Sequence, residues 1–94
     1  MPDRILHLNL VREFFDAIAD GTKTEEYRDR TDFWKTRLEG REYDIIRFRN
    51  GYGPDVPEMD VEWKGVEKVV RKGLPQYVIK LGRIVSSERW RDDR

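Results

Sequence analysis

A short polar segment, residues 21–28, holds the residue types most able to do chemistry in this chain. It reads Gly-Thr-Lys-Thr-Glu-Glu-Tyr-Arg and has almost no apolar filler, whereas a buried strand is normally rich in valine, isoleucine and phenylalanine. A lysine beside a carboxylate can transfer a proton or bind a carbonyl or phosphate group. Burying such charges is costly unless they pair or meet a polar ligand. The segment therefore predicts either a polar ligand site or a solvated edge strand with cross-strand ion pairs.

Four residues of this segment are candidate functional groups. Lys23, Glu26 and Tyr27 are candidates for proton transfer, and the planar fork of Arg28 suits phosphate or carboxylate. In a regular strand, Lys23 and Glu26 point to opposite faces, so a shared cleft requires the backbone to twist or bulge just after Gly21. The alternatives are an exposed Lys23–Glu26 ion pair and a bidentate pair between Arg28 and a neighbouring carboxylate.

Four residues outside the segment are candidates for ligand binding: Asn9, Trp34, Asn50 and Tyr52. Aromatic rings stack on bases in single-strand recognition, and Tyr52 lies in a loop rich in turn residues, where a core role is harder to assign. Trp34 shares helical spacing with Leu38, which also makes it a candidate for the core. Asn9 is also placed to cap the helix that follows it.

The composition disfavours metal and cofactor chemistry. The chain has a single histidine, His7, and no cysteine, so only carboxylates could complete a metal site. It has no P-loop, no dinucleotide-binding glycine pattern and no nucleophile elbow. We predict no metal and no cofactor, and we expect His7 to be an ordinary strand residue.

The polar segment lies directly after a predicted strand and helix. Residues 5–8 are typical of a strand, and apolar residues spaced at i, i+4 and i+8 predict a helix over 11–20. Gly21 is placed to end this helix in a left-handed conformation. The segment itself is then expected to form a strand over about 22–29.

The remainder of the chain predicts a second helix and several strands. The helix is expected over 31–40, with Thr31 or Asp32 as its cap. Alternating apolar residues and turn signals predict strands over 42–49, 59–64, 66–71 and 76–85, with a break or bulge at Gly65. Five or six strands with two short helices indicate an α+β, mainly β fold, a partly closed β-barrel. A ferredoxin-like sandwich is the alternative, although it requires longer helices.

Size and hydropathy bound the class of protein. Ninety-four residues, 37% hydrophobic and 40% charged, make one small domain with a densely ionic surface. We place the domain at residues 1–85 and a charged tail at 86–94. No apolar run approaches the roughly 20 residues of a membrane span, and no signal peptide is evident, so we expect a cytoplasmic monomer.

Charge is balanced overall but unevenly distributed. The net charge is zero, which disfavours general binding of nucleic acid. Residues 55–62 are acidic, whereas residues 64–83 are mainly basic. This pattern predicts either strands that pair by charge or a basic face that meets phosphate.

The polar segment also resembles a family signature. The pattern Gly-x-Lys-x-x-Glu-x-Arg is matched by Gly21, Lys23, Glu26 and Arg28. It resembles the signature of ASCH domains, small β-barrels of the PUA-like superfamily. The strand and helix over 6–20 and the apolar strand over 77–82 are similar to that family's opening and closing elements. The resemblance implies a PUA-like fold in which Lys23 and Glu26 line a cleft between barrel and helix.

The resemblance implies a function as well. PUA domains bind RNA, so a cleft that binds RNA or a nucleotide is expected. Because some family members are ribonucleases and others are amidohydrolases of N4-acetylcytidine, a small metal-independent hydrolase is the alternative. In the amidohydrolase branch a threonine nucleophile stands where this chain has Glu26, and Thr24 is two positions earlier, which disfavours amide hydrolysis. A protein-interaction adaptor with a charged surface is a further hypothesis.

Overall fold

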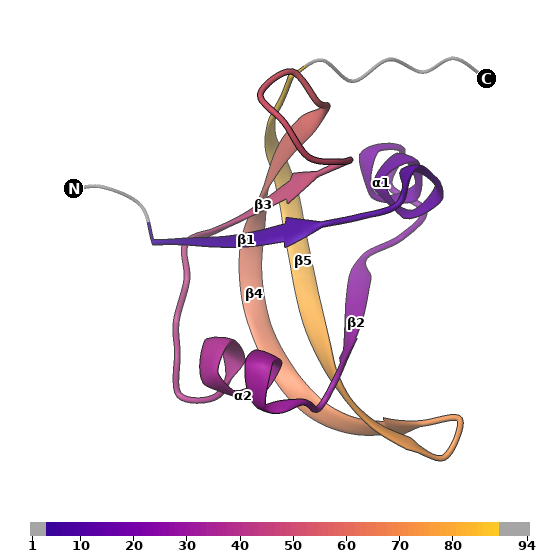
Figure 1. Cartoon of the computed structure of the whole chain (residues 1–94), viewed down its shortest axis with the longest axis vertical. Coiled ribbons are helices and arrows are strands. Elements are labelled where there is room, and N and C mark those ends of the chain that lie inside the picture. Colours follow the sequence, from indigo (N-terminus) through magenta and orange to yellow (C-terminus); the bar gives the residue numbers. More distant parts are fainter. Residues whose placement is uncertain (1–3, 89–94) are drawn as a thin grey trace.

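The computed structural model describes residues 4–88, which form five strands and two short helices (Figure 1). In chain order these are β1 (Ile5–Asn9), α1 (Arg12–Ala19), β2 (Glu25–Asp29), α2 (Asp32–Leu38), β3 (Ile45–Arg49), β4 (Glu58–Arg71) and β5 (Leu74–Glu88). No helix within residues 4–88 is long and apolar enough to cross a membrane.

The strands form one mixed sheet in the order β1-β3-β4-β5-β2. Only β1 and β3 pair in parallel, and each of the other neighbouring pairs is antiparallel. Strands β1 and β2 are the two edges, and no ladder joins them in the described part of the chain, so the sheet is not closed. The predicted small α+β fold with a β-rich sheet and two short helices is confirmed at this level.

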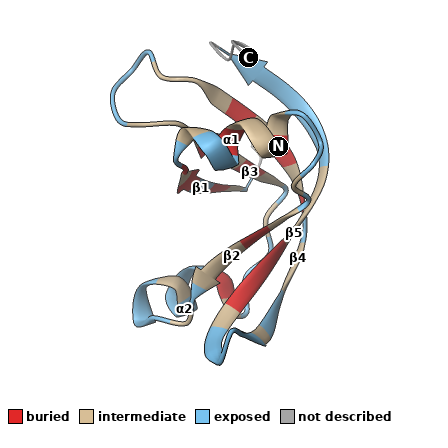
Figure 2. Ribbon diagram, turned by 90° about the vertical axis from the view of Figure 1, so that its right-hand side faces the viewer, coloured by how far each residue is buried: buried red, intermediate tan, exposed pale blue. Residues whose placement is uncertain are grey.

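Strands β4 and β5 carry the curvature of the sheet (Figure 2). Their register shifts three times between Asp60 and Val66, and Gly65 has a φ of +114°, which a residue with a side chain adopts only under strain. The predicted irregularity at Gly65 is therefore confirmed. It bends one continuous strand, however, rather than separating the two shorter strands that we expected.

The core lies between the sheet and the two helices. Its buried side chains come from α1, α2 and the four strands β1, β3, β4 and β5, and they include Leu6, Leu8, Phe15, Ile18, Leu38, Ile46, Phe48, Met59, Val61 and Ile79. The alternation predicted for β3 holds, because Ile46 and Phe48 are buried while the residues between and beside them are not. Trp34 packs against this core from α2 and is only partly buried.

Several element boundaries differ from the predictions. Helix α1 buries Phe15 and Ile18 in the core, whereas Phe14 is 45% exposed and the N-cap residue Val11 is 61% exposed, because one side of the helix packs against the core. Strand β3 begins three residues later than expected, and β5 continues to Glu88. The predicted tail therefore starts as a strand over residues 86–88, and the rest of it lies outside the described residues.

Two turns illustrate where local signals succeed and fail. Thr31 caps α2 as predicted, since its Oγ1 accepts a hydrogen bond from the backbone N–H of Trp34 at 3.3 Å. The turn between the strands expected over 66–71 and 76–85 is made by Lys72 and Gly73, which both have positive φ. Leu74 already belongs to β5.

Candidate functional site

The turn after α1 decides which face of the sheet Lys23 reaches. Gly21 has a φ of +86°, and the backbone N–H of Lys23 returns to the Ala17 carbonyl at 3.0 Å. Strand β2 begins only at Glu25, so its alternation does not extend back to Lys23. The Lys23 ammonium therefore lies 3.4 Å from Oε1 of Glu26. The twist expected after Gly21 is present.

Glu26 is the only buried charged residue in the described part of the chain, with 5% of its surface exposed. Its Oε1 faces Lys23, and its Oε2 accepts a hydrogen bond from Nη2 of Arg28 at 2.7 Å. Two cations and one carboxylate leave this Lys23–Glu26–Arg28 triad with a formal charge of +1. The structure thus brings the three predicted charged residues together, rather than leaving Lys23 and Glu26 as an exposed pair.

Arg28 joins the two open edges of the sheet. Besides the bond to Glu26, its Nη2 donates to the backbone carbonyl of Asn9 at 3.1 Å, which spans from β2 to β1. The guanidinium carbon lies 5.0 Å from the centroid of the Trp34 ring. The Nε of Arg28 is buried and has no hydrogen-bond partner among residues 4–88. Arg28 therefore does not form the bidentate carboxylate pair that the sequence allowed.

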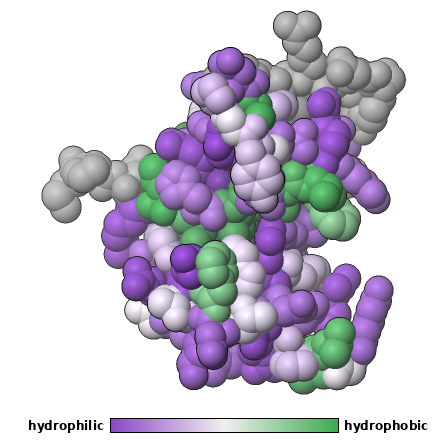
Figure 3. Space-filling model, in the orientation of Figure 1, coloured by the Kyte–Doolittle hydropathy of each residue, from purple (hydrophilic) through white to green (hydrophobic). Residues whose placement is uncertain are grey.

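A pocket of about 250 Å³, which we call the triad pocket, opens beside these groups. The end of β1, the start of α1 and the middle of β2 line it: Asn9, Leu10, Val11, Phe14, Glu26, Tyr27 and Arg28. The Lys23 ammonium lies 5.2 Å from the centroid of the Phe14 ring and 5.6 Å from that of Tyr27. Figure 3 shows an apolar area over α1 within an otherwise mainly hydrophilic face, and exposed Phe14 belongs to that helix.

Tyr27 does not join the triad through its hydroxyl. The hydroxyl donates to Oε1 of Glu25 at 2.8 Å on the other face of β2, where the Arg71 guanidinium lies 4.0 Å from the ring centroid. The hydrogen bond to Glu25, followed by desolvation, raises the pKa of Tyr27. Of the three candidate proton-transfer residues, the structure therefore assembles Lys23 and Glu26, while Tyr27 contributes only its ring to the pocket wall.

The two candidate asparagines hold the loop after β3 against β1. The Asn9 side chain donates to the Gly51 carbonyl at 2.6 Å and accepts from the Gly51 N–H at 3.1 Å. Asn50 donates to the Leu10 carbonyl at 3.0 Å. The predicted cap at Asn9 is wrong, because Val11 is the N-cap of α1 and makes no side-chain bond. Asn9 lines the triad pocket, and Asn50 supports its wall from outside.

Of the remaining candidates, Trp34 contacts the triad. Tyr52 is 87% exposed and does not line the pocket, whereas Trp34 underlies the Arg28 guanidinium. His7 is exposed on β1. Residues 4–88 contain no group of three or more histidine, aspartate or glutamate side chains arranged to hold a metal ion.

The acidic stretch before Trp63 is matched by arginines on β3. Arg47 donates to both carboxylate oxygens of Asp60, at 2.8 and 2.9 Å, and Arg49 lies 3.3 Å from Glu58. The hydrogen bond to Asp60 is the largest of the effects that raise the pKa of Arg47. Arg47 and Arg49 are therefore paired with carboxylates of the neighbouring strand. This pairing makes them less available to bind phosphate.

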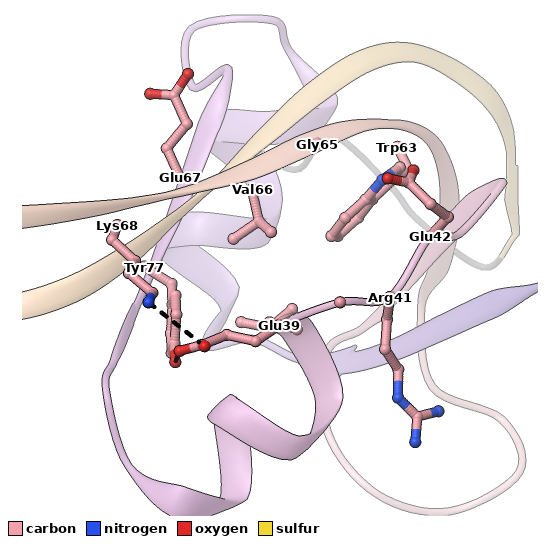
Figure 4. Close-up of a pocket in the computed structure, with 11 residues that line it drawn as sticks. Glu39, Arg41, Glu42, Trp63, Gly65, Val66, Glu67, Lys68 and Tyr77 are labelled. Carbon is pink, nitrogen blue, oxygen red and sulfur yellow. Dashed lines mark hydrogen bonds and ion pairs between the residues drawn. The ribbon is translucent and has the colours of Figure 1, made fainter.

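A larger cavity, about 550 Å³, lies elsewhere, between the end of α2 and the bend of β4 (Figure 4). Its lining includes Glu39, Glu42, Trp63, Val66 and Tyr77, and none of these was a sequence-predicted site residue. The only sequence signal was Gly65, which interrupts the alternation of β4 at this place. A cavity formed by residues far apart in sequence leaves no local pattern.

Comparisons of this chain with known protein families, with curated proteins and with solved structures find no match.

Proposed function

We propose that this chain is an ASCH-type domain that binds RNA or a nucleotide in the triad pocket. The observation that carries the proposal is a buried carboxylate, Glu26, held between two cations at the edge of a pocket with an exposed aromatic ring. A buried ion network contributes little net stability compared with apolar packing, so a role in ligand recognition accounts for its presence.

The triad has unused capacity toward a ligand. An ammonium group has three N–H donors, and Lys23 makes a single ion pair at 3.4 Å. Its remaining donors suit a phosphate or carbonyl oxygen, and the formal charge of +1 favours an anionic group. Phe14, 45% exposed beside the ammonium, offers a face on which a base can stack.

The geometry favours binding over hydrolysis. Both oxygens of Glu26 already face cations, and the hydroxyl of Tyr27 is committed to Glu25. A carboxylate at position 26 also repels the oxyanion that amide hydrolysis develops, and it is not the hydroxyl nucleophile of the amidohydrolase branch. Ribonuclease activity at Lys23 and Glu26 is the second candidate, because a lysine 3.4 Å from a carboxylate is a pair that can transfer a proton.

The architecture is compatible with a PUA-like barrel. The sheet is open between β1 and β2, and the side chain of Arg28 spans that opening to the Asn9 carbonyl. In this proposal, the arginine of the motif both holds the two edges together and forms the pocket wall. We further propose that the protein acts as a cytoplasmic monomer.

The test is a binding assay with a panel of nucleotides and short single-stranded RNAs. Lys23→Ala should weaken binding about tenfold or more, because it removes a charge-assisted hydrogen bond. Lys80→Ala is the matched control, since Lys80 pairs with Glu25 on the opposite face of the same strand and should bind like the wild type. Affinity for RNA should also fall as salt rises.

Three results would overturn the proposal. They are failure to bind any nucleotide or RNA, equal losses in the two lysine variants, and robust turnover of N4-acetylcytidine that is abolished by Glu26→Ala. The first result, together with retained binding to a protein partner, would favour the adaptor hypothesis.

A further inference from the structure

A pocket of about 330 Å³ lies on the outer face of β2, opposite the triad. We call it the outer pocket, and residues of β2, β4 and β5 line it: Glu25, Tyr27, Glu67, Val69, Val70, Arg71, Val78 and Lys80. Val78 is only 3% exposed although it does not belong to the core cluster, and Val69 beside it is partly buried. The pocket therefore offers an apolar floor, and its volume lies within the range of small-molecule sites.

Arg71 is a cation of this pocket that no carboxylate neutralises in the described part of the chain. Its guanidinium carbon lies 4.0 Å from the centroid of the Tyr27 ring, and its side chain makes no ion pair or hydrogen bond within residues 4–88. Lys80, by contrast, is paired with Glu25. Stacking on the ring holds the planar guanidinium in position and leaves its N–H donors unused. Such a fork suits a carboxylate.

Glu67 is an unpaired carboxylate of the same pocket. It pairs in register with Val78, which pairs in turn with Tyr27, so the three form one row across β4, β5 and β2. Glu67 is exposed and makes no ion pair or hydrogen bond among residues 4–88. Its backbone borders the larger cavity as well, but Figure 4 shows its carboxylate on the opposite side of β4 from Val66. The row thus ends in Glu67 on one side and in the Arg71 guanidinium over the Tyr27 ring on the other.

We infer that the outer pocket binds a small zwitterion with an apolar side chain, the class that includes apolar amino acids and their dipeptides. The carboxylate of such a ligand accepts hydrogen bonds from Arg71, its ammonium donates to Glu67, and its side chain packs over Val78. A ligand with a single charged end leaves one of the two protein charges without a partner. The inference concerns a different pocket from the triad pocket and does not depend on the proposed function.

The experiment follows the methyl resonances of Val78 by NMR, because Val78 lines neither the triad pocket nor the larger cavity. Leucine and leucyl-leucine are the probes, and the tighter of the two shows whether a single amino acid or a dipeptide fits the pocket. It should shift the resonances in a saturable manner. It should also bind about fivefold more tightly than its N-acetylated derivative, which lacks the ammonium, and than its C-terminal amide, which lacks the carboxylate.

Matched variants assign the two charges, and both change exposed side chains. Arg71→Gln should weaken binding of the zwitterion about fivefold and leave binding of the amide unchanged, whereas Glu67→Gln should weaken the zwitterion equally and leave the N-acetylated derivative unchanged. Lys72→Gln and Glu42→Gln are the controls, because neither residue lines the outer pocket, and they should bind like the wild type. Three results would each overturn the inference: Val78 resonances that do not move at millimolar probe, derivatives that bind as tightly as the zwitterion, and equal effects of Arg71→Gln and Lys72→Gln.

Discussion

The two faces of β2 carry similar residues in very different surroundings. On the inner face, Glu26 is buried between Lys23 and Arg28. On the outer face, the Glu25 side chain pairs with the Lys80 side chain. The Glu25 side chain is 34% exposed and the Lys80 side chain is 38% exposed. The same alternating strand thus presents one charged network to the protein interior and another to solvent, and burial rather than residue type separates them.

The difference matters because burial changes what the loss of one partner costs. The charges of an exposed ion pair are readily hydrated when the pair is broken, so the pair contributes little to the free energy of unfolding. A buried one cannot, because removing one member leaves the others uncompensated in a medium of low polarity. Loss of one charge should therefore cost more stability in the inner network than in the outer pair.

The comparison predicts its largest effect for the two neighbouring glutamates. Glu26→Gln should lower the free energy of unfolding by about 3 kcal/mol, because Lys23 and Arg28 then lack a counter-charge. Glu25→Gln is the same substitution one residue away on the outer face, and its effect should stay within the scatter of surface substitutions. Urea denaturation monitored by circular dichroism measures both. Equal losses would show that the two networks are energetically alike.

Two tyrosine–glutamate hydrogen bonds, one exposed and one at a buried tyrosine, should differ in their effect on stability at alkaline pH. Tyr27 bonds Glu25 on the outer face, whereas buried Tyr77, which pairs in register with Arg28, bonds Glu39. Desolvation, and then the Glu39 hydrogen bond, raise the pKa of Tyr77 to about 12. Since an unfolded tyrosine ionises near pH 10, the stability due to this group is complete below about pH 10. It is lost as pH rises toward about 12.

Ultraviolet titration of tyrosinate in the wild type and in Tyr77→Phe checks this expectation. The difference between the two curves should show a group that ionises near pH 12, and the variant should lose less stability than the wild type between pH 10 and 12. The matched variant is Tyr27→Phe, which removes the outer hydroxyl. A difference curve for Tyr77 centred near pH 10 would contradict the structural environment described for it.

The charged residues of the site were more predictable from the sequence than the cavity. Lys23, Glu26 and Arg28 lie within six residues. Regular strand spacing puts Lys23 and Glu26 on opposite faces, and the resemblance to ASCH domains supplied the expectation that they share a cleft. The direction of Tyr27 also follows from strand alternation, although its residue type had placed it with the candidates for proton transfer. Asn9 was assigned to a local cap because its true partner, Gly51, is 42 residues away.

The fold shows the same division between local and distant information. Short-range patterns indicated both helices, the buried face of β3 and the bulge at Gly65. The continuity of β4 through that bulge depends on pairing with β5, and the exposure of Phe14 depends on how much of α1 the sheet covers. Neither can be obtained from the spacing of residues within one element.

The smallest expected effect concerns the outer ion pair itself. The hydrogen bond from Lys80, followed by the one from Tyr27, holds the pKa of Glu25 below its ordinary value. A lowered carboxyl pKa contributes stability above the ordinary value, about 4.3, and that contribution is lost as pH falls through the lowered value. Because both side chains are accessible to solvent, the change in stability should be hard to detect, whereas the titration of Glu25 itself should be easy to follow.

Carboxyl-detected NMR should show the pKa of Glu25 rising toward its ordinary value in Lys80→Gln. The pKa should remain low in Lys64→Gln, because Lys64 is not the partner of Glu25. An unchanged Glu25 titration in Lys80→Gln would mean that the outer pair does not persist in solution, which would sharpen the contrast with the buried triad.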